Sequence, residues 1–146
     1  MNQRYRFISY LTLIVFIFGS TETSIAANNK KFNVVIHISK NQKSSFTAAI
    51  NQAQIIRNHY GKEKVNIEVL VNGTGVGFVN KQNVYVTSIK ELINNGVRFT
   101  ACNASVKRML KTQNIETPLI DGVKFVPFGV VRLIDLQRQG YYYLKP

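Results

Sequence analysis

The stretch Val97-Arg98-Phe99-Thr100-Ala101-Cys102-Asn103-Ala104-Ser105 decides the fold of this chain of 146 residues. Its first five residues are typical of a short buried strand, and the residues from Asn103 onward predict a helix. A strand that passes directly into a helix is one step of an alternating α/β chain. The carboxyl ends of the strands in such a sheet are where ligands and reactive groups collect, and Cys102 falls at this edge.

The same alternation continues on both sides of this stretch. Strands are predicted at 32–39, 65–71, 97–101, 123–127 and 141–144, and helices at 44–60, 87–95, 103–112 and 129–139. In the last helix, Val130, Leu133, Ile134 and Leu136 are expected to form the apolar face. The sequence therefore predicts a single three-layer α/β domain, with a mostly parallel five-stranded sheet and helices on both faces.

The amino terminus has the layout of a secretory signal peptide. Arg4 and Arg6 give a positive start, an apolar run follows at 7–18, and small residues then offer cleavage after Ala26 or Ala27. The apolar run has 12 residues. A membrane-spanning helix needs about 20, so we expect cleavage rather than anchoring.

Removal of residues 1–27 leaves 28–146 as the folded domain, and we expect that domain in the periplasm with no membrane attachment. The chain is strongly basic, with 19 Lys and Arg against 7 Asp and Glu, a formal net charge of +12. These basic residues are scattered, and no nucleic-acid-binding module is recognisable, so no nucleic acid partner is expected. The charge instead predicts solubility and weak attraction to anionic surfaces and small anions.

Cys102 is the only cysteine. An exported chain with one cysteine has no internal disulfide, so the thiol is buried, paired between chains or kept reactive. A helix N-terminus lowers a thiol pKa, and the N–H groups of Asn103 and Ala104 are expected to stabilise the thiolate. The alternative is a small buried hydrophobe. Position alone leaves both interpretations open.

The segment Gly73-Thr74-Gly75-Val76-Gly77 follows the second predicted strand. It predicts a tight turn whose backbone N–H groups are available to a small anion. Phe78 stands where a dinucleotide fingerprint needs its third glycine, and the lysine of a P-loop is absent. We therefore expect no nucleotide cofactor.

The chain has two histidines, His37 and His59. They are too few for a metal site without further nitrogen or sulfur ligands, so no metal is expected. His37, near the carboxyl end of the first strand, forms a catalytic pair with Cys102 only if their strands are neighbours. Otherwise it is a histidine satisfied by hydrogen bonds.

Several segments together resemble the DsrE/DsrF-like family of small α/β proteins. They are 34–39, 69–76, 92–103, and the ending 126–133 through 137–146. The most specific parts are the stretch Gly96-Val97-Arg98-Phe99-Thr100-Ala101-Cys102 and the tail Gln137-Arg138-Gln139-Gly140-Tyr141. The resemblance covers nearly all of residues 28–146. It implies a five-stranded parallel sheet between helices and a homo-oligomer, a trimer or hexamer. In the sulfur-relay members a cysteine at this loop carries sulfur as a persulfide, and by position that residue is Cys102.

The leading hypothesis is an exported DsrE-like protein in which Cys102 takes sulfane sulfur from a donor and passes it to an acceptor protein. In this hypothesis Asn103 and Ala104 stabilise the thiolate, while His37 and 73–75 (Gly73, Thr74, Gly75) bind the substrate. The alternative is a non-catalytic oligomer that binds a small anion or serves assembly, with a structural cysteine.

Overall fold

The computed structural model describes residues 31–113 and 119–146, so the predicted signal peptide at 1–27 lies outside the described residues. The elements in chain order are β1 (Phe32–Ile38), α1 (Lys43–Tyr60), β2 (Val65–Val71), η1 (Gly73–Val79, a 3-10 helix), α2 (Val86–Asn94), β3 (Arg98–Cys102), α3 (Asn103–Gln113), β4 (Lys124–Val126), α4 (Gly129–Arg138) and β5 (Tyr142–Leu144).

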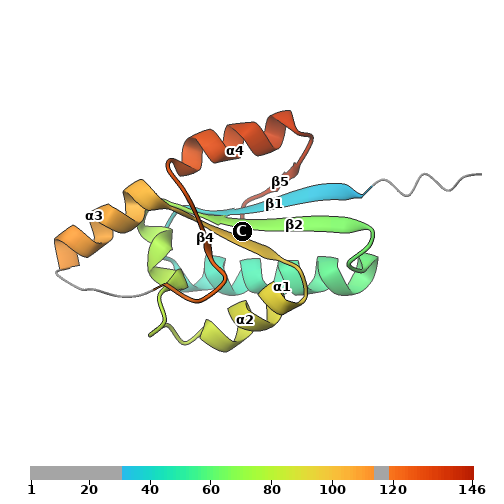
Figure 1. Ribbon diagram of the computed structural model, residues 1–146. Coiled ribbons are helices and arrows are strands. Elements are labelled where there is room, and N and C mark those ends of the chain that lie inside the picture. Colours follow the sequence, from blue (N-terminus) through green and yellow to red (C-terminus); the bar gives the residue numbers. More distant parts are fainter. Residues whose placement is uncertain (1–30, 114–118) are drawn as a thin grey trace, which may run out of the picture.

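The five strands form one sheet in the order β4-β3-β2-β1-β5, and each neighbouring pair is parallel. The chain adds β2, β3 and β4 in one direction from β1, then returns through α4 to place β5 on the other side of β1. Because strand crossovers are right-handed, this reversal puts α4 on the face opposite α1 and α2, as Figure 1 shows. The predicted three-layer α/β fold is confirmed.

The larger hydrophobic core lies between the sheet and helices α1 and α2. Alternate residues of β1 point into it, namely Val34, Ile36 and Ile38, each at most 4% exposed. On the helix side, Phe46 stacks on Phe78 with ring centroids 4.4 Å apart. Since Phe78 belongs to η1, this core fixes the segment that follows β2.

The layer between the sheet and α4 has a much smaller apolar core, built around Val35, Leu70 and Leu136. A buried ion pair supplements it. Glu68, 1% exposed, accepts hydrogen bonds from Arg132 Nε at 2.9 Å and Arg132 Nη2 at 2.7 Å. The position of α4 therefore depends on a charge pair as well as on apolar packing.

The predicted apolar face of α4 is wrong in part. Val130 is 61% exposed and Ile134 is 53% exposed, while Leu133 is partly buried and Leu136 fully buried. The helix turns Arg132 toward the sheet because Glu68 needs a cation there, and that rotation carries the two branched side chains outward. The outer surface of α4 is consequently apolar.

Arg57 closes the amino edge of the sheet. Its side chain is buried, and its guanidinium donates to the carbonyl oxygens of Gly61 at 3.2 Å, Val65 at 3.0 Å and Gly96 at 3.2 Å. These carbonyls belong to the segments that lead into β2 and β3. A single cation therefore holds two strand entrances together at the edge opposite Cys102.

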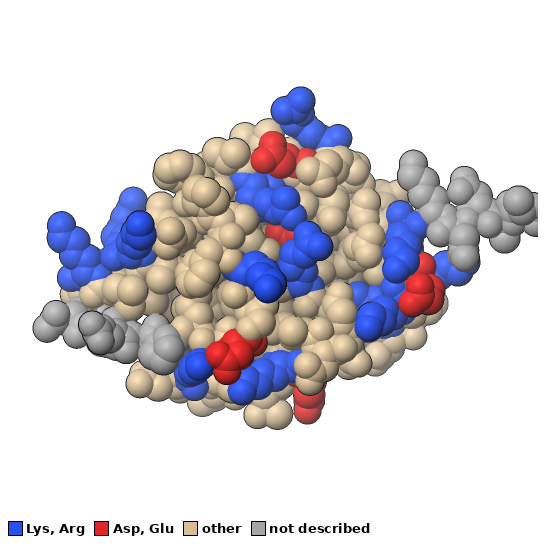
Figure 2. Space-filling view, in the orientation of Figure 1, with Lys and Arg blue, Asp and Glu red and all other residues tan. Residues whose placement is uncertain are grey.

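On the face shown in Figure 2, the Lys and Arg side chains stand in separate groups with uncharged surface between them. They form no continuous band over that face. No helix within residues 31–113 and 119–146 has the length and apolar character needed to cross a bilayer.

Candidate functional site

Side chains from neighbouring strands form a row on the α4 face of the sheet, at the carboxyl ends of the strands. Val35 and Leu70 pack toward α4, and side chains alternate along a strand, so His37 and Asn72 lie on that same face. A Cβ built on Gly129 of α4 would lie 2.8 Å from Asn72 Cβ and 3.1 Å from Cys102 Cβ. Asn72 and Cys102 are therefore neighbours beneath the first turn of α4.

The Cys102 thiol lies where the amino ends of α3 and α4 converge. The residue is 5% exposed, and its S–H donates toward the carbonyl oxygen of Pro127 at 3.9 Å. Burial raises the pKa of the thiol. Hydrogen bonds from the Ser105 hydroxyl and from the backbone N–H groups of Gly129, Ser105 and Ala104 lower it further than burial raises it. The thiol pKa is thus held below its ordinary value, as expected beside helix N-termini.

Ser105 connects the sulfur to η1. Its hydroxyl oxygen accepts a hydrogen bond from the Gly73 N–H at 2.9 Å, which leaves the hydroxyl hydrogen to be donated to the sulfur. Gly73 has φ of +52°, and a Cβ there would lie 2.5 Å from the Ser39 carbonyl oxygen. Only glycine fits this position, so the approach of η1 to Ser105 depends on it.

Ser105 and Gly129 are the partners of the sulfur that the sequence did not reveal. Ser105 lies within the first turn of the helix that follows Cys102. A hydroxyl at that position in the sequence indicates a candidate hydrogen bond to the thiol. Gly129 approaches from α4, far along the chain. The only local sign was a glycine at the start of a predicted helix.

His37 lies in a second hydrogen-bonded group beside this site. Its Nε2 is 3.1 Å from Asn72 Oδ1, and its Nδ1 is 3.0 Å from the Tyr143 hydroxyl of β5. In the neutral ring, Nε2–H donates to the amide oxygen and Nδ1 accepts from the phenol. Burial lowers the pKa of His37, the hydrogen bond with Asn72 raises it, and the positive Lys145 lowers it, with a net value below 6.5.

The condition for a direct pair between His37 and Cys102 is not met. β2 lies between β1 and β3 in the sheet, so the two residues are not on neighbouring strands. Asn72, the residue after β2, lies between them. Its side chain is hydrogen-bonded to His37, and its Cβ packs beside Cys102 beneath Gly129. His37 is a histidine whose two ring nitrogens are satisfied by hydrogen bonds.

The predicted turn after β2 is the 3-10 helix η1, and its internal hydrogen bonds occupy backbone N–H groups that were expected to bind an anion. The Gly75 N–H donates to the Asn72 carbonyl at 3.0 Å, and Gly75 is buried against Ile38. Its N–H is therefore not available to an anion, contrary to expectation. The Ala104 N–H donates to the Pro127 carbonyl oxygen at 3.3 Å and is also among the groups that lower the thiol pKa, whereas Asn103 is not among them.

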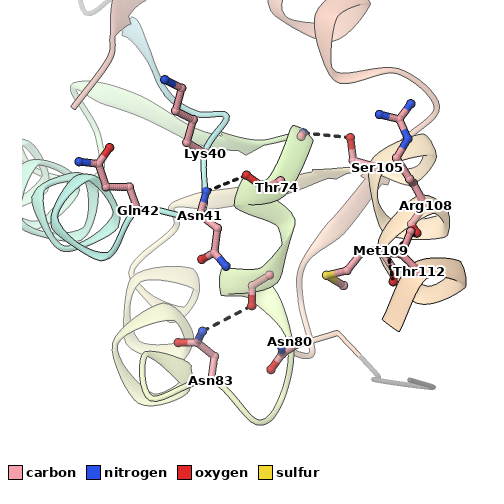
Figure 3. A pocket seen from close by; sticks show the side chains of 12 residues that line it. Lys40, Asn41, Gln42, Thr74, Asn80, Asn83, Ser105, Arg108, Met109 and Thr112 are labelled. Atoms are coloured by element: carbon pink, nitrogen blue, oxygen red, sulfur yellow. Dashed lines mark hydrogen bonds between the residues drawn. The ribbon is translucent and has the colours of Figure 1, made fainter. Parts of the chain in front are cut away.

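Gly73 and Thr74 line a groove of about 800 Å³ that also includes Ser105. Figure 3 shows the side chains that line this groove, most of which come from the segment before α1, from η1 and from α3. Cys102 does not line it, so Ser105 lies between the groove and the thiol. Across the described ranges, no group of three or more His, Cys, Asp or Glu residues is placed to hold a metal ion.

Comparisons with known proteins agree with this architecture. The model of the DsrE/DsrF-like family matches residues 20–146. A protein of unknown function from Methanobacterium thermoautotrophicum, MTH1491, is similar in structure with a TM-score of 0.69 and 28% identity, over 80% of this chain and 100% of that one. No match was found among curated proteins.

Two further solved structures share the fold at lower identity. The ychN protein from E. coli has a TM-score of 0.59 and 14% identity, over 80% of this chain and 98% of that one. BT1422 from Bacteroides thetaiotaomicron, a conserved protein of unknown function, has a TM-score of 0.58 and 17% identity, over 83% of this chain and 97% of that one. Because the family model covers nearly the whole of the described domain, the chain belongs to the DsrE/DsrF-like family.

Proposed function

We propose that this protein carries sulfane sulfur on Cys102, receiving it from a donor and passing it to an acceptor protein. The observation that supports the proposal best is the convergence of two helix N-termini and the Ser105 hydroxyl on one thiol. These donors stabilise negative charge on sulfur. A thiolate is the form of cysteine that attacks sulfur, and a persulfide is itself acidic, so the same donors serve both the free and the loaded state.

The transfer is a thiol exchange without net oxidation. The Cys102 thiolate attacks the terminal sulfur of a donor persulfide, R–S–SH. A new S–S bond forms, the S–S bond of the donor breaks, and the products are Cys102–S–SH and the donor thiolate R–S⁻. Delivery reverses this exchange: an acceptor thiolate takes the terminal sulfur, and the bond between the two sulfurs breaks to restore the Cys102 thiolate.

Access to the sulfur comes through the segment before α4. Pro127 and Gly129 cover the thiol from that side, and the neighbouring Phe128 is 59% exposed. This segment contributes no side chain to the larger core. A shift of residues 127–129 uncovers Cys102 without disturbing the main packing of the sheet.

The test is the intact mass of the native protein before and after incubation with a small persulfide donor such as glutathione persulfide, beside Cys102→Ser. Gain of sulfur by the native chain alone supports the carrier role. The 5% exposure of Cys102 favours the alternative of a structural cysteine in a non-catalytic protein. An unchanged mass while the protein remains folded supports that alternative and contradicts the proposal.

We also propose that the protein is a homo-oligomer, a trimer or hexamer as the family resemblance implies. The supporting observation is the exposed apolar surface of α4 and its neighbours, where Phe125, Phe128, Val130, Val131 and Ile134 are each more than half exposed. Apolar patches of this kind mark interaction surfaces. Sedimentation equilibrium measures the assembled mass directly, and a purely monomeric protein contradicts this proposal.

Export to the periplasm by the predicted signal peptide at 1–27 is likewise a proposal. Fractionation of cells that produce the full chain tests it, together with the mass of the recovered protein. Recovery from the periplasmic fraction with an amino terminus at residue 27 or 28 supports export, whereas an uncleaved chain in the cytosolic fraction contradicts it.

A further inference from the structure

We propose that the groove between η1, the segment before α1 and α3 binds a small organic anion rich in acceptor oxygens, a phosphate ester or a polycarboxylate. The groove has a volume of about 800 Å³, which is the size of a metabolite site. This inference does not depend on sulfur transfer, since Cys102 does not line the groove.

The charge of the groove is positive. Lys40, from the segment after β1, and Arg108, from α3, line it from two sides, and no Asp or Glu is among the described lining residues. Neither cation has an ion pair within the described part of the chain. Both charges are therefore available to a ligand, and Arg108 offers the planar fork that suits a phosphate or carboxylate.

Several side-chain oxygens that line the groove already accept hydrogen bonds from the protein. Thr74 Oγ1 accepts from the Asn41 N–H at 2.9 Å, and Ser105 Oγ accepts from Gly73. Asn80 Oδ1 accepts from the Gln82 N–H at 2.9 Å. The Thr74 hydroxyl hydrogen and the Asn80 amide N–H₂ remain as donors, whereas Thr112 donates its hydroxyl hydrogen to the carbonyl oxygens of Arg108 and Met109, each at 3.0 Å.

Asn83, which lies near Asn80 in Figure 3, has both ends of its amide paired within the protein. Its Oδ1 accepts from the Tyr85 N–H at 3.0 Å, and its Nδ2 donates to the Gly77 carbonyl oxygen at 3.4 Å. The two cations without carboxylates, together with the donors of Thr74 and Asn80, suit a ligand that carries negative charge on acceptor oxygens. A cationic ligand would be repelled by Lys40 and Arg108.

Ser105 gives binding a second, independent readout. Its hydroxyl has one hydrogen, which the Cys102 sulfur accepts in the empty protein. An anion in the groove competes for that hydrogen and adds negative charge close to the thiol. Occupancy therefore slows alkylation of Cys102, and thermodynamic linkage requires that the thiolate weakens the anion in turn.

Isothermal titration calorimetry at physiological salt tests the site with three probes: adenosine monophosphate, glycerol 3-phosphate and citrate. The matched variants are Arg108→Gln, which removes a charge from the groove, and Lys107→Gln, which removes a charge from the adjacent exposed position of α3. Arg108→Gln should weaken binding about tenfold, and Lys107→Gln less than about twofold. The phosphate probes and citrate separate the two ligand sources.

Two results overturn the proposal. One is the absence of binding by all three probes up to about 10 mM, a range that covers weak metabolite sites. The other is equal weakening by Arg108→Gln and Lys107→Gln, which indicates diffuse attraction to a basic surface. In the variant Ser105→Ala, the bound probe should slow Cys102 alkylation less than it does in the native protein, because only the charge effect remains, and an equal slowing there refutes the link through the Ser105 hydroxyl.

Discussion

Replacement of Gly129 by alanine tests the arrangement of donors around Cys102. The added Cβ would meet Asn72 Cβ at 2.8 Å and Cys102 Cβ at 3.1 Å, so the first turn of α4 must move away from the sulfur. Such overpacking costs about 1–3 kcal/mol, and the higher helix propensity of alanine offsets up to about 1 kcal/mol. The protein should therefore remain folded with a modest loss of stability.

The larger effect falls on the thiol. Moving α4 removes the Gly129 N–H from the sulfur, and a hydrogen bond to a charged group contributes about 1.5–3 kcal/mol. The lower end of that range corresponds to an about tenfold smaller fraction of thiolate at any pH below the pKa. We expect the pKa of Cys102 to rise in Gly129→Ala.

The assay is the rate of alkylation by iodoacetamide as a function of pH. The midpoint of the profile reports the pKa, and the plateau at high pH reports access to the sulfur, so the two effects of moving α4 are separated. Gly77→Ala is the control, because the added Cβ there meets nothing closer than Asn41 Nδ2 at 3.7 Å. A midpoint in Gly129→Ala that is unchanged or lower refutes the reasoning.

Three further predictions concern other parts of the molecule. Glu68→Gln breaks a buried pair and should lose about 3–5 kcal/mol in urea unfolding. Arg98→Ala, at a side chain 57% exposed and 3.4 Å from Glu68, should lose at most about 1 kcal/mol, and equal losses would contradict the difference in burial. Stability should fall as the pH drops through 6.5, because the unfolded chain binds a proton there while His37 stays neutral in the fold. His37→Gln should flatten that part of a thermal-unfolding profile, and an equally steep profile in the variant would exclude His37 as its origin. If the proposed homo-oligomer assembles through α4, Val131→Asp and Ile134→Asp, at positions 51% and 53% exposed, should leave the circular dichroism of the fold unchanged but shift sedimentation to the mass of one protomer. An unchanged assembled mass would move the interface elsewhere.

The fold was predictable because its signals are local. The strand from Val65 to Val71 has the predicted bounds, and the helix predicted from 44 begins one residue earlier, at Lys43. β-branched runs and helical spacing need only a few residues of context. The predicted strand at 97–101 is shifted by one residue, so Cys102 is the last residue of β3 rather than the first after it.

The site was less predictable because its partners meet only in three dimensions. Nothing near Cys102 in the sequence indicates that Gly129 covers it, since this contact follows from the strand order and the return of α4 across the sheet. The exposure of Val130 was unpredictable for a similar reason, because it follows from a contact between distant elements. Glu68 on β2 orients Arg132 inward, and helical spacing alone does not report a charge pair between distant elements.

The role of Arg57 at the amino edge bears on how this scaffold tolerates change. Its guanidinium donates hydrogen bonds to the carbonyl oxygens of Gly61, Val65 and Gly96 at the same time. A residue inserted near any of them would separate at least one carbonyl from the cation. The carboxyl edge has no equivalent clamp among the described residues. A library built to diversify recognition should therefore vary exposed side chains at the carboxyl edge without lengthening η1, which is fixed by Gly73 and Phe78, and should leave the turns around Arg57 at their present length.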